Sequence, residues 1–373
     1  MPIKEPLKIF VDAYLLNKEY QGTRTYIKEL YIEFAKRNRK AVVSFGCFED
    51  ERIVDEFSDV PNIHFIFYET TNRFKRMLFE IPKLIKSNDF DIAHFQYVIP
   101  FSRNKSTKYI VTIHDILFND FKDQFSFSYR LKRNFLFKYS ARKSNFLTTV
   151  SSYSKERLRS VYKLKKEIYI TKNGVKSDYF KEYDKQKEIN YINERYKIKD
   201  YLLYISRIEP RKNQQAVIHA FSKIKNKELS LVFIGNKSIQ NSNLDKILAS
   251  LNDEEKSKIH FFDSVPEIEL LSFIRGAKVF VYPSVAEGFG IPPLEAAAVK
   301  IPVLCSNATA MNDFNFFSPF HIDFHDNEKV VENLKELIFF KDDKKLNDIS
   351  AIVQNKYSWE KASIVLESII KNA

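Results

Sequence analysis

The hydrophobic positions of the chain fall into short apolar runs, separated by stretches in which apolar residues recur every three or four positions. The runs in the first half are residues 7–11, 42–45, 64–67, 91–95, 109–113, 146–150 and 168–171. Short runs rich in β-branched and aromatic residues are typical of buried strands, and the wider spacing is typical of helices, as over residues 23–34. This alternation predicts a parallel, doubly wound sheet.

The same alternation starts again in the second half of the chain. Its apolar runs are residues 201–205, 229–234, 259–262, 279–284 and 303–305. Residues 181–199 lie between the two blocks and are charged and weakly periodic, which is typical of a linker. A chain of 373 residues also exceeds what one core usually serves. We therefore expect an α/β protein with two Rossmann-like domains, residues 1–182 and 183–373, that face each other across a ligand-binding cleft.

Residues 279–298 (VFVYPSVAEGFGIPPLEAAA) carry the strongest functional signal. A predicted strand runs into a loop that holds Glu287 and two glycines, and a proline pair then opens an alanine-rich helix that contains Glu295. Proline suits the first helical turn, where backbone N–H groups have no partner within the helix. A glycine-flanked loop at a helix start predicts an anion site. A nucleotide-sugar matches such a site, because its phosphates carry hydroxyl-bearing groups on both sides.

Two cations follow the strand predicted at residues 201–205. Arg207 and Lys212 lie in the segment SRIEPRKN, between that strand and a helix. A planar guanidinium and an ammonium at this place would neutralise a diphosphate. Because the departure of a nucleoside diphosphate builds up negative charge, fixed cations here would also stabilise the transition state.

Glu287 and Glu295 admit two interpretations. Two carboxylates that flank a sugar bond are the arrangement of a glycosidase. Both residues belong to one local element beside an anion site, however, which favours a role as acceptors for the hydroxyl groups of a sugar and a ribose.

His114 ends the apolar run at residues 109–113. At a strand end that borders a cleft, its imidazole would donate to a sugar hydroxyl or carbonyl group. A pKa near neutrality would also let it assist proton movement.

Asp89 and Asp91 have the spacing of the metal-binding Asp-x-Asp motif of some sugar transferases. They precede a predicted strand and so belong to the opposite edge of the sheet from the ligand site. We therefore expect no essential metal and no cofactor besides the sugar donor.

The chain carries 60 Lys and Arg against 48 Asp and Glu, a formal charge of +12. This excess suits phosphate-bearing partners or an anionic membrane surface, and it equally fits a lysine-rich genome, because Lys, Asn, Ile and Phe are all abundant. Cys47 and Cys305 have no metal-binding spacing, which favours a reducing cytoplasm over secretion. Residues 1–16 have no signal-peptide profile, and no run approaches the ~20 apolar residues of a membrane span. These features predict a cytoplasmic protein.

Two stretches, residues 75–86 and 130–143, are both basic and rich in aromatic residues. They fit helices that lie on the inner face of an anionic membrane, and they fit core-packing helices whose lysines face solvent. Nucleic-acid binding uses the same residue types, but no recognisable motif accompanies them, and we expect no nucleic-acid partner.

Over essentially its whole length the chain resembles family 4 of the sequence-based glycosyltransferase classification. The segments that carry the resemblance are VTIHDILF, TVSSYSKE, KNGV, SRIEPRKN, PSVAEGFGIPPLEAAA and YSWEKAS, in that order. Members of this family are retaining enzymes of the GT-B fold. The resemblance implies that fold here, with a final helix at about residues 358–370 that crosses back onto the first domain. Lys300 departs from the pattern, because a glycine is usual at its position.

The resemblance also implies roles for single residues. Arg207 and Lys212 would hold the donor diphosphate, Glu287 the hydroxyl groups of the donor sugar, and Glu295 the ribose. The residues implied in donor binding are Gly22, Arg207, Lys212, Glu287, Gly288, Phe289, Gly290, Ile291 and Glu295. The residues implied in catalysis are His114, Glu287, Arg207 and Lys212.

The expected reaction is transfer of a hexose-type sugar from a nucleotide-sugar to a hydroxyl group, with retention at the anomeric carbon. No carboxylate is clearly placed as a nucleophile, which favours a front-face substitution. The EPRKN form of the cation loop resembles that of mannosyl- and related transferases of bacterial surface polysaccharides. GDP-mannose is therefore the first choice of donor, and a glycan or a lipid-linked oligosaccharide the acceptor. The alternatives are a nucleotide-sugar epimerase of the same fold, a glycosidase, and a non-catalytic basic module for membrane or nucleic acid.

Overall fold

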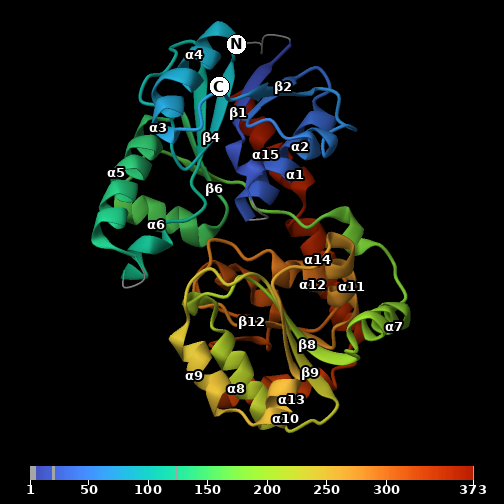
Figure 1. Cartoon of the computed structure of the whole chain (residues 1–373). Helices are drawn as coiled ribbons and strands as arrows, with labels where there is room; N and C mark the ends of the chain where they lie inside the picture. The colour runs from blue at the N-terminus through green and yellow to red at the C-terminus, as the bar shows by residue number, and fades with distance from the viewer. Residues whose placement is uncertain (1–5, 19–21, 123–124, 373) are drawn as a thin grey trace. The chain divides into compact units, whose positions relative to one another are not determined.

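The computed structural model describes residues 6–18, 22–122 and 125–372, which form two compact units (Figure 1). Unit 1 comprises Met1–Gly174 and Ser358–Ala373, and unit 2 comprises Val175–Tyr357. The chain thus passes from unit 1 to unit 2 after residue 174, whereas the domain boundary predicted from the sequence was residue 182. The two points at which the chain passes between the units lie side by side, because the backbone N–H of Val175 donates to the carbonyl oxygen of Tyr357 (2.9 Å).

Unit 1 is built on a seven-stranded sheet in which all strand pairs are parallel. Its strands are β1 (Lys8–Asp12), β2 (Val42–Cys47), β3 (Ile63–Phe67), β4 (Ile92–Gln96), β5 (Lys108–Thr112), β6 (Phe146–Thr149) and β7 (Ile168–Ile170). They run in the order β3-β2-β1-β4-β5-β6-β7 across the sheet, so Ile9 of β1 pairs with Val43 on one side and Ile92 on the other. The strand order reverses between β1 and β4, which is where doubly wound sheets bind ligands.

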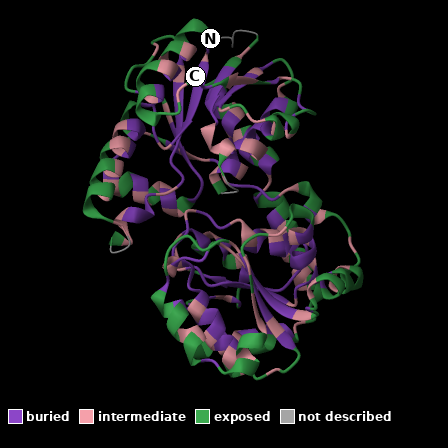
Figure 2. Ribbon diagram, viewed as in Figure 1, coloured by how far each residue is buried: buried purple, intermediate pink, exposed green. Residues whose placement is uncertain are grey.

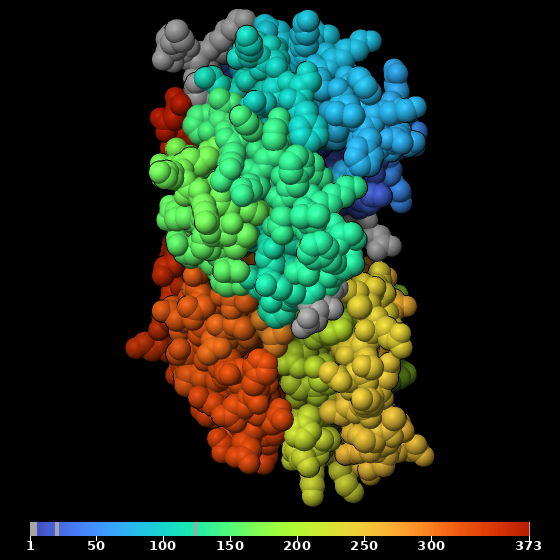
Figure 3. Space-filling view, turned by 90° about the vertical axis from the view of Figure 1, so that its left-hand side faces the viewer, coloured from blue at the N-terminus to red at the C-terminus, as the bar shows by residue number. Residues whose placement is uncertain are grey.

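Helices connect these strands, and several are capped by the residues that favour helix starts. The helical elements are η1 (Tyr14–Asn17), α1 (Gly22–Arg37), α2 (Glu51–Asp55), α3 (Arg73–Lys75), the π-helical η2 (Arg76–Glu80), α4 (Ile81–Ser87), η3 (Leu117–Asn119), α5 (Phe127–Lys143), α6 (Ser152–Tyr162) and α15 (Trp359–Lys371). The side chain of Ser151 accepts from the backbone N–H of Ser154 (3.1 Å) at the start of α6. The face of unit 1 that carries α5 is open to solvent (Figure 3).

A chain of polar side chains crosses the interior of unit 1. His94 accepts or donates at both ring nitrogens, 2.7 Å from the Tyr31 hydroxyl and 2.7 Å from Thr112 Oγ1. Thr112 Oγ1 in turn lies 2.6 Å from Thr148 Oγ1, and all four residues are fully buried. Burial lowers the pKa of His94 to about 3, so its imidazole is neutral. The buried polar groups are therefore matched by hydrogen bonds rather than by charge.

The C-terminal helix α15 packs on α1 (Figure 1). Its buried face includes Trp359 and Leu366, and at the surface Arg37 of α1 binds Glu367 (2.8 Å) and Glu360 (3.1 Å). An apolar stripe at helical spacing drives this docking. The C-terminal segment therefore belongs to the compact body of unit 1, although about 180 residues of unit 2 separate it from β7 along the chain.

Unit 2 repeats the architecture with a six-stranded parallel sheet. Its strands are β8 (Asp200–Ile205), β9 (Leu229–Ile234), β10 (Ile259–Phe262), β11 (Val279–Tyr282), β12 (Val303–Ser306) and β13 (His321–Ile322), in the order β10-β9-β8-β11-β12-β13. Its helical elements are η5 (Ser177–Phe180), α7 (Lys185–Tyr196), η6 (Pro210–Lys212), α8 (Gln214–Ile224), α9 (Ser242–Ser250), α10 (Asp253–Ser257), α11 (Glu267–Gly276), α12 (Pro292–Ala298), η7 (Thr309–Phe317), α13 (Asn327–Ile338) and α14 (Asp343–Lys356). The predicted fold class, α/β with two doubly wound parallel sheets, is confirmed.

The linker predicted at residues 181–199 is wrong, because most of it forms α7. Ile192 on this helix is fully buried, and Glu188 binds Arg275 of α11 (3.1 Å). The single buried apolar position explains why the hydrophobic pattern was weak. Lys300, where a glycine was expected, has φ +61° in the turn before β12, the left-handed conformation that glycine adopts without cost.

The central strands of both sheets are almost completely buried, whereas the outermost strands β3 and β10 are partly exposed and most other exposed residues lie on the outer helices and loops (Figure 2). Within the described ranges, no helix is long and apolar enough to cross a membrane. Cys47 and Cys305 are buried and not linked to each other, and burial raises the pKa of the Cys47 thiol to about 12.

The docking of α15 predicts the effect of a substitution at Gly174. A Cβ atom there would lie 2.6 Å from the backbone carbonyl carbon of Ser358, just before α15. We expect Gly174→Ala to destabilise unit 1 by about 2 kcal/mol, measured as a lower melting temperature. Gly22→Ala is the matched control, because a Cβ atom at Gly22 meets no atom within 4 Å. Equal melting temperatures for the two variants would contradict this account of the docking.

Candidate active site

The candidate site of unit 2 lies at the carboxyl ends of its two central strands. Residues 206–213 follow β8, and residues 283–291 follow β11, where the strand order of the sheet reverses. Loops that leave such a reversal point in opposite directions open a ligand site between them. The two loops touch each other, since the backbone N–H of Val285 donates to the carbonyl oxygen of Arg211 (2.9 Å).

The centre of the site is a buried ion pair between these loops. Lys212 Nζ binds Glu287 Oε1, and Arg211 Nη1 lies 3.2 Å from the other carboxylate oxygen, Oε2. The hydroxyl of Tyr282 donates to Glu287 Oε1 (2.8 Å). Lys212 and Glu287 are 7% and 8% exposed, so the pair is almost removed from water. Both oxygens of Glu287 therefore have partners within the protein.

The charges of this pair are set by its surroundings. Burial acts to raise the pKa of Glu287, but the charges of Lys212 and Arg211 and the hydrogen bonds from Lys212 and Tyr282 outweigh it and lower the pKa to about 2. Burial also lowers the pKa of Lys212, against the attraction of Glu287. Glu287 is thus a carboxylate throughout the physiological range, and its low basicity makes it a weak nucleophile.

A second buried carboxylate extends the network toward solvent. Glu209 is 4% exposed and binds Arg211 Nε (2.8 Å) and Arg207 Nε (3.2 Å). The side chain of Arg207 is 48% exposed, whereas that of Lys212 is 9% exposed. Of the two cations singled out in the sequence, Arg207 is therefore the one at the surface, and Lys212 lies behind it against Glu287.

The glycine loop after β11 is anchored by Phe289. Its ring packs edge-on against Phe314 (5.8 Å) and Tyr357 (6.0 Å), and the residue is buried. Gly290 has φ +101°, a conformation that side-chain-bearing residues rarely adopt. The backbone N–H of Glu287 is already used, since it donates to Thr309 Oγ1 (2.9 Å).

The loop leads into α12, which spans only two turns. Proline stands at its start, as expected, and the N–H groups of Leu294 and Glu295 bond back to the carbonyl oxygen of Ile291 (2.9 and 3.1 Å). Burial raises the pKa of Glu295 to about 7, against the charge of Lys176 and a hydrogen bond from Tyr179. The two acids of the predicted motif thus differ, because Glu287 is ionised at neutral pH whereas the pKa of Glu295 lies near 7.

His114, in unit 1, is buried, and its pKa lies far below neutrality. It is 6% exposed, its Nε2 lies 2.8 Å from Gln96 Oε1, and the rings of Tyr26 and Tyr97 pack against it (4.9 and 5.3 Å). Burial lowers its pKa to about 3. The pKa near neutrality that was expected for His114 is therefore wrong, and its roles in hydrogen bonding and proton movement stay predictions.

The remaining predicted residues lie as follows. Gly22 is the first residue of α1 and is exposed, and the two residues before it, 20 and 21, fall outside the described part of the chain. Asp91 Oδ2 accepts from the backbone N–H of Lys8 (2.9 Å) at the amino edge of the sheet, a structural role. In the ranges that the structure describes, no group of three His, Cys, Asp or Glu side chains gathers as metal ligands do.

Three residues of the charge network were not predicted from the sequence: Glu209, Arg211 and Tyr282. Glu209 and Arg211 stand within the segment SRIEPRKN itself, and their alternation with Arg207 and Lys212 was the available signal. Tyr282 ends β11 five residues before Glu287, and nothing in the sequence marks its hydroxyl as a partner of that carboxylate.

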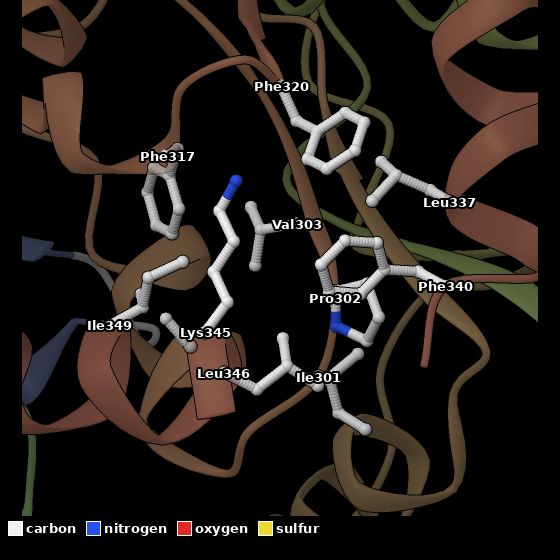
Figure 4. A pocket seen from close by; sticks show the side chains of 11 residues that line it. Ile301, Pro302, Val303, Phe317, Phe320, Leu337, Phe340, Lys345, Leu346 and Ile349 are labelled. Atoms are coloured by element: carbon white, nitrogen blue, oxygen red, sulfur yellow. The ribbon is translucent and has the colours of Figure 1, made fainter. Parts of the chain in front are cut away.

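A hollow in unit 2 is not part of this site (Figure 4). It is lined by apolar side chains that include Ile301, Phe317 and Phe340, and its volume is about 10 Å³, too small for a substrate. Pro302 in its wall precedes β12, which places the hollow at the amino edge of the sheet, away from the loops that carry the charges.

Both units match family models of glycosyltransferases. Residues 20–179 match the model of Glycosyltransferase Family 4, and residues 185–356 match that of Glycosyl transferases group 1. Together the two matches take in most of the chain. The chain belongs to the family 4 glycosyltransferases.

Two curated relatives are O-antigen enzymes. The O-antigen chain mannosyltransferase RfbU of Salmonella typhimurium is 29% identical over 252 residues, which cover 65% of this chain and 64% of that protein. The O-antigen chain mannosyltransferase B of Escherichia coli is 29% identical over 176 residues, 45% of each chain. The matched regions thus span less than two thirds of either relative.

Solved structures share the fold over the whole chain. WaaG, a glycosyltransferase involved in lipopolysaccharide biosynthesis, matches with a TM-score of 0.70 over 98% of this chain and all of that one, at 15% identity. This likeness confirms the GT-B fold class that the sequence predicted.

The buried pair predicts strong coupling between Lys212 and Glu287. Lys212→Met and Glu287→Gln should each destabilise unit 2 by about 3 kcal/mol, because each leaves the partner charge buried and uncompensated. The double variant should lose clearly less than the sum, as measured by melting temperatures in a double-mutant cycle.

Acid provides a second check on the same pair. The folded pKa of Glu287, about 2, lies below its ordinary value of 4.5, so the stabilisation is complete above pH 4.5 and is lost as the pH falls toward 2. The cost of Glu287→Gln should shrink over that interval. Additive single effects, or a cost independent of pH, would contradict the pairing.

Proposed function

We propose that this chain is a retaining glycosyltransferase that moves a hexose-type sugar from a nucleotide-sugar to a hydroxyl group of a glycan or lipid-linked acceptor in surface polysaccharide synthesis. The observation that carries the proposal is the charge cluster at the carboxyl ends of β8 and β11, in which Arg211 and Lys212 bind Glu287, and Arg207 joins the cluster through Glu209. Membership in the glycosyltransferase family assigns the chemistry that such a cluster would serve.

In this mechanism the cations bind the leaving diphosphate and neutralise its charge. Departure of a nucleoside diphosphate places negative charge on the β-phosphate, and Arg207 and Lys212 offer fixed positive charge for it. Glu287 holds Lys212 in place and offers its carboxylate to hydroxyl groups of the donor sugar. Glu295 would hold the ribose, and the backbone of Gly288 to Ile291 would line the sugar and phosphate.

Retention follows best from a front-face substitution. Glu287 has both oxygens engaged and a pKa of about 2, so it is a poor nucleophile for a covalent sugar intermediate. In a front-face path the leaving phosphate itself takes the proton of the acceptor hydroxyl. This path needs neither a base of pKa near 7 nor a metal ion, because the cations stabilise the diphosphate.

Mannose is the proposed sugar, with GDP-mannose as donor. The support is the EPRKN form of the cation loop and the names of the relatives, both of which are O-antigen chain mannosyltransferases. The acceptor would then be a growing glycan or a lipid-linked oligosaccharide.

The test of this function is a transfer assay in excess EDTA with GDP-mannose and a mannose-terminated oligosaccharide. Wild type should form a product of retained configuration. Arg207→Gln should lower the rate ~100-fold, equivalent to ~3 kcal/mol, because one cation at the diphosphate is lost. Arg207 is half exposed, so the variant should fold, whereas Lys212→Ala removes a buried charge as well. Lys335→Gln, an exposed lysine on α13, is the matched control and should keep the wild-type rate.

Each other outcome of this assay has a defined meaning. Wild-type rates in Arg207→Gln and Lys212→Ala would refute the role of the cations, and activity that needs Mg²⁺ would refute metal independence. An isomerised donor without acceptor would identify an epimerase, and cleavage of a glycoside without nucleotide a glycosidase. A basic binding module would show no thermal stabilisation by UDP, GDP or TDP.

We further propose that unit 1 touches the inner face of an anionic membrane through α5 and residues 73–79. Seven large apolar or aromatic side chains there are exposed: Phe74, Leu78, Phe79, Phe127, Tyr129, Leu131 and Phe135. The two segments adjoin, since Lys132 Nζ lies 4.9 Å from the ring of Phe74. α5 contains no acidic residue, so its surface combines apolar groups with uncompensated positive charge.

The test is cosedimentation with vesicles. Wild type should bind vesicles that contain anionic lipid, less at high salt, and not zwitterionic vesicles. Phe127→Glu combined with Leu131→Glu should weaken binding at least tenfold. Ile268→Glu, on an equally exposed residue of unit 2, should not change it. Equal binding by both variants would refute this surface.

A further inference from the structure

Arg76 is a buried arginine without an acidic partner. It is 3% exposed and is the first residue of the π-helical turn η2. Nη1 donates to the carbonyl oxygens of Thr70 (3.3 Å) and Thr71 (3.5 Å), and Nε has no hydrogen-bond partner. Arg76 forms no ion pair within 4.0 Å in the described part of the chain. Buried charges are normally paired, and π-helical turns occur often at functional sites.

Three aromatic rings hold the guanidinium in place. Its central carbon lies 5.2 Å from the ring centre of Tyr14 and 5.1 Å from those of Phe48 and Tyr68. Such contacts stabilise the cation but leave its hydrogen-bonding capacity partly unused. Asp12 supplies negative charge at longer range, and its carboxylate accepts from the hydroxyl of Tyr68 (2.8 Å).

Two further arginines are within electrostatic range of the Tyr14 hydroxyl. Burial and the negative charge of Asp12 raise the pKa of Tyr14, and the positive charges of Arg73, Arg76 and Arg133 lower it. Arg73 lies three residues before Arg76 and is exposed, and Arg133 on α5 is partly exposed. Neither forms an ion pair within the described ranges. The arginine cluster, Arg73, Arg76 and Arg133, thus carries an excess of positive charge.

The arginine cluster lies beside the ligand-binding edge of the unit 1 sheet. Asp12 is the last residue of β1, and Phe48 and Tyr68 directly follow β2 and β3. The carboxyl ends of parallel strands next to a reversal of strand order are where doubly wound sheets bind ligands. The unused donor of Arg76 is therefore at an edge where a ligand would be expected.

We propose that the arginine cluster binds an anionic group, a phosphate or a carboxylate, carried by the sugar acceptor. Arg73 and Arg133 meet the group at the surface, and Arg76 supplies fixed positive charge behind them. This inference rests on the proposed function, since it assigns the acceptor of that reaction. It restricts that acceptor to glycans or lipid-linked glycans with a negative charge close to the accepting sugar.

The test measures binding of inorganic phosphate, glucuronate and methyl α-mannoside by calorimetry. Wild type should bind at least one of the two anions and should bind methyl α-mannoside at least tenfold more weakly. Binding of phosphate would indicate a phosphorylated acceptor, and binding of glucuronate would indicate an acceptor with an acidic sugar. Arg73→Gln combined with Arg133→Gln should weaken anion binding at least tenfold. Arg76 itself is not replaced, because loss of a buried charge among three rings could unfold the unit.

Two controls separate this site from the donor site. Arg39→Gln removes an exposed arginine that precedes β2, at the amino edge of the same sheet, and should leave anion binding unchanged. Arg207→Gln should weaken binding of GDP and leave anion binding at the arginine cluster in place. Anion binding that is insensitive to Arg73→Gln with Arg133→Gln would overturn the proposal. Absence of GDP binding, with anion binding still dependent on Arg73 and Arg133, would instead refute the proposed donor and keep the anion site.

Discussion

The ion pair between Lys212 and Glu287 is the interaction on which the site of unit 2 depends. It joins the loop after β8 to the loop after β11, and it is almost completely buried. A buried pair is costly unless its remaining groups are satisfied, and here Arg211 and Tyr282 complete the contacts of the carboxylate. Such a pair holds its two side chains in fixed positions more than it stabilises the fold. It fixes a carboxylate and an ammonium at the one point of the sheet where two loops diverge.

The same topology organises both units but serves them differently. In unit 2 the carboxyl edge carries compensated charge, with Glu209 and Glu287 set among Arg207, Arg211 and Lys212. In unit 1 the carboxyl edge carries aromatic rings around Arg76, with Asp12 at longer range. The ligands that we propose for the two edges differ accordingly: a diphosphate and sugar hydroxyl groups at the edge of unit 2, and an anionic group of the acceptor at the edge of unit 1.

Burial decides which ionisable groups can take part in chemistry. His94 and His114 both have pKa values near 3, because desolvation disfavours the imidazolium and no carboxylate compensates it. Glu287 is equally buried but keeps its charge because two cations surround it. Neither imidazole is therefore charged near neutral pH. The proposed front-face path does not require a charged histidine, because the departing phosphate takes the proton of the acceptor.

The sequence by itself determined the two doubly wound sheets, because short apolar runs that alternate with helical spacing have few other solutions. It also placed SRIEPRKN and the Glu287 to Glu295 segment after strands, as the structure has them, and predicted a ligand site there. It failed at α7, whose single buried side chain, Ile192, leaves hardly any periodic signal. Only the tertiary structure decided that Lys212 turns inward to Glu287 while Arg207 stays exposed, that His114 is neutral, and that Arg76 forms no ion pair among the residues that the structure describes. These properties depend on desolvation and on distances between residues far apart in the chain, and the local sequence specifies neither.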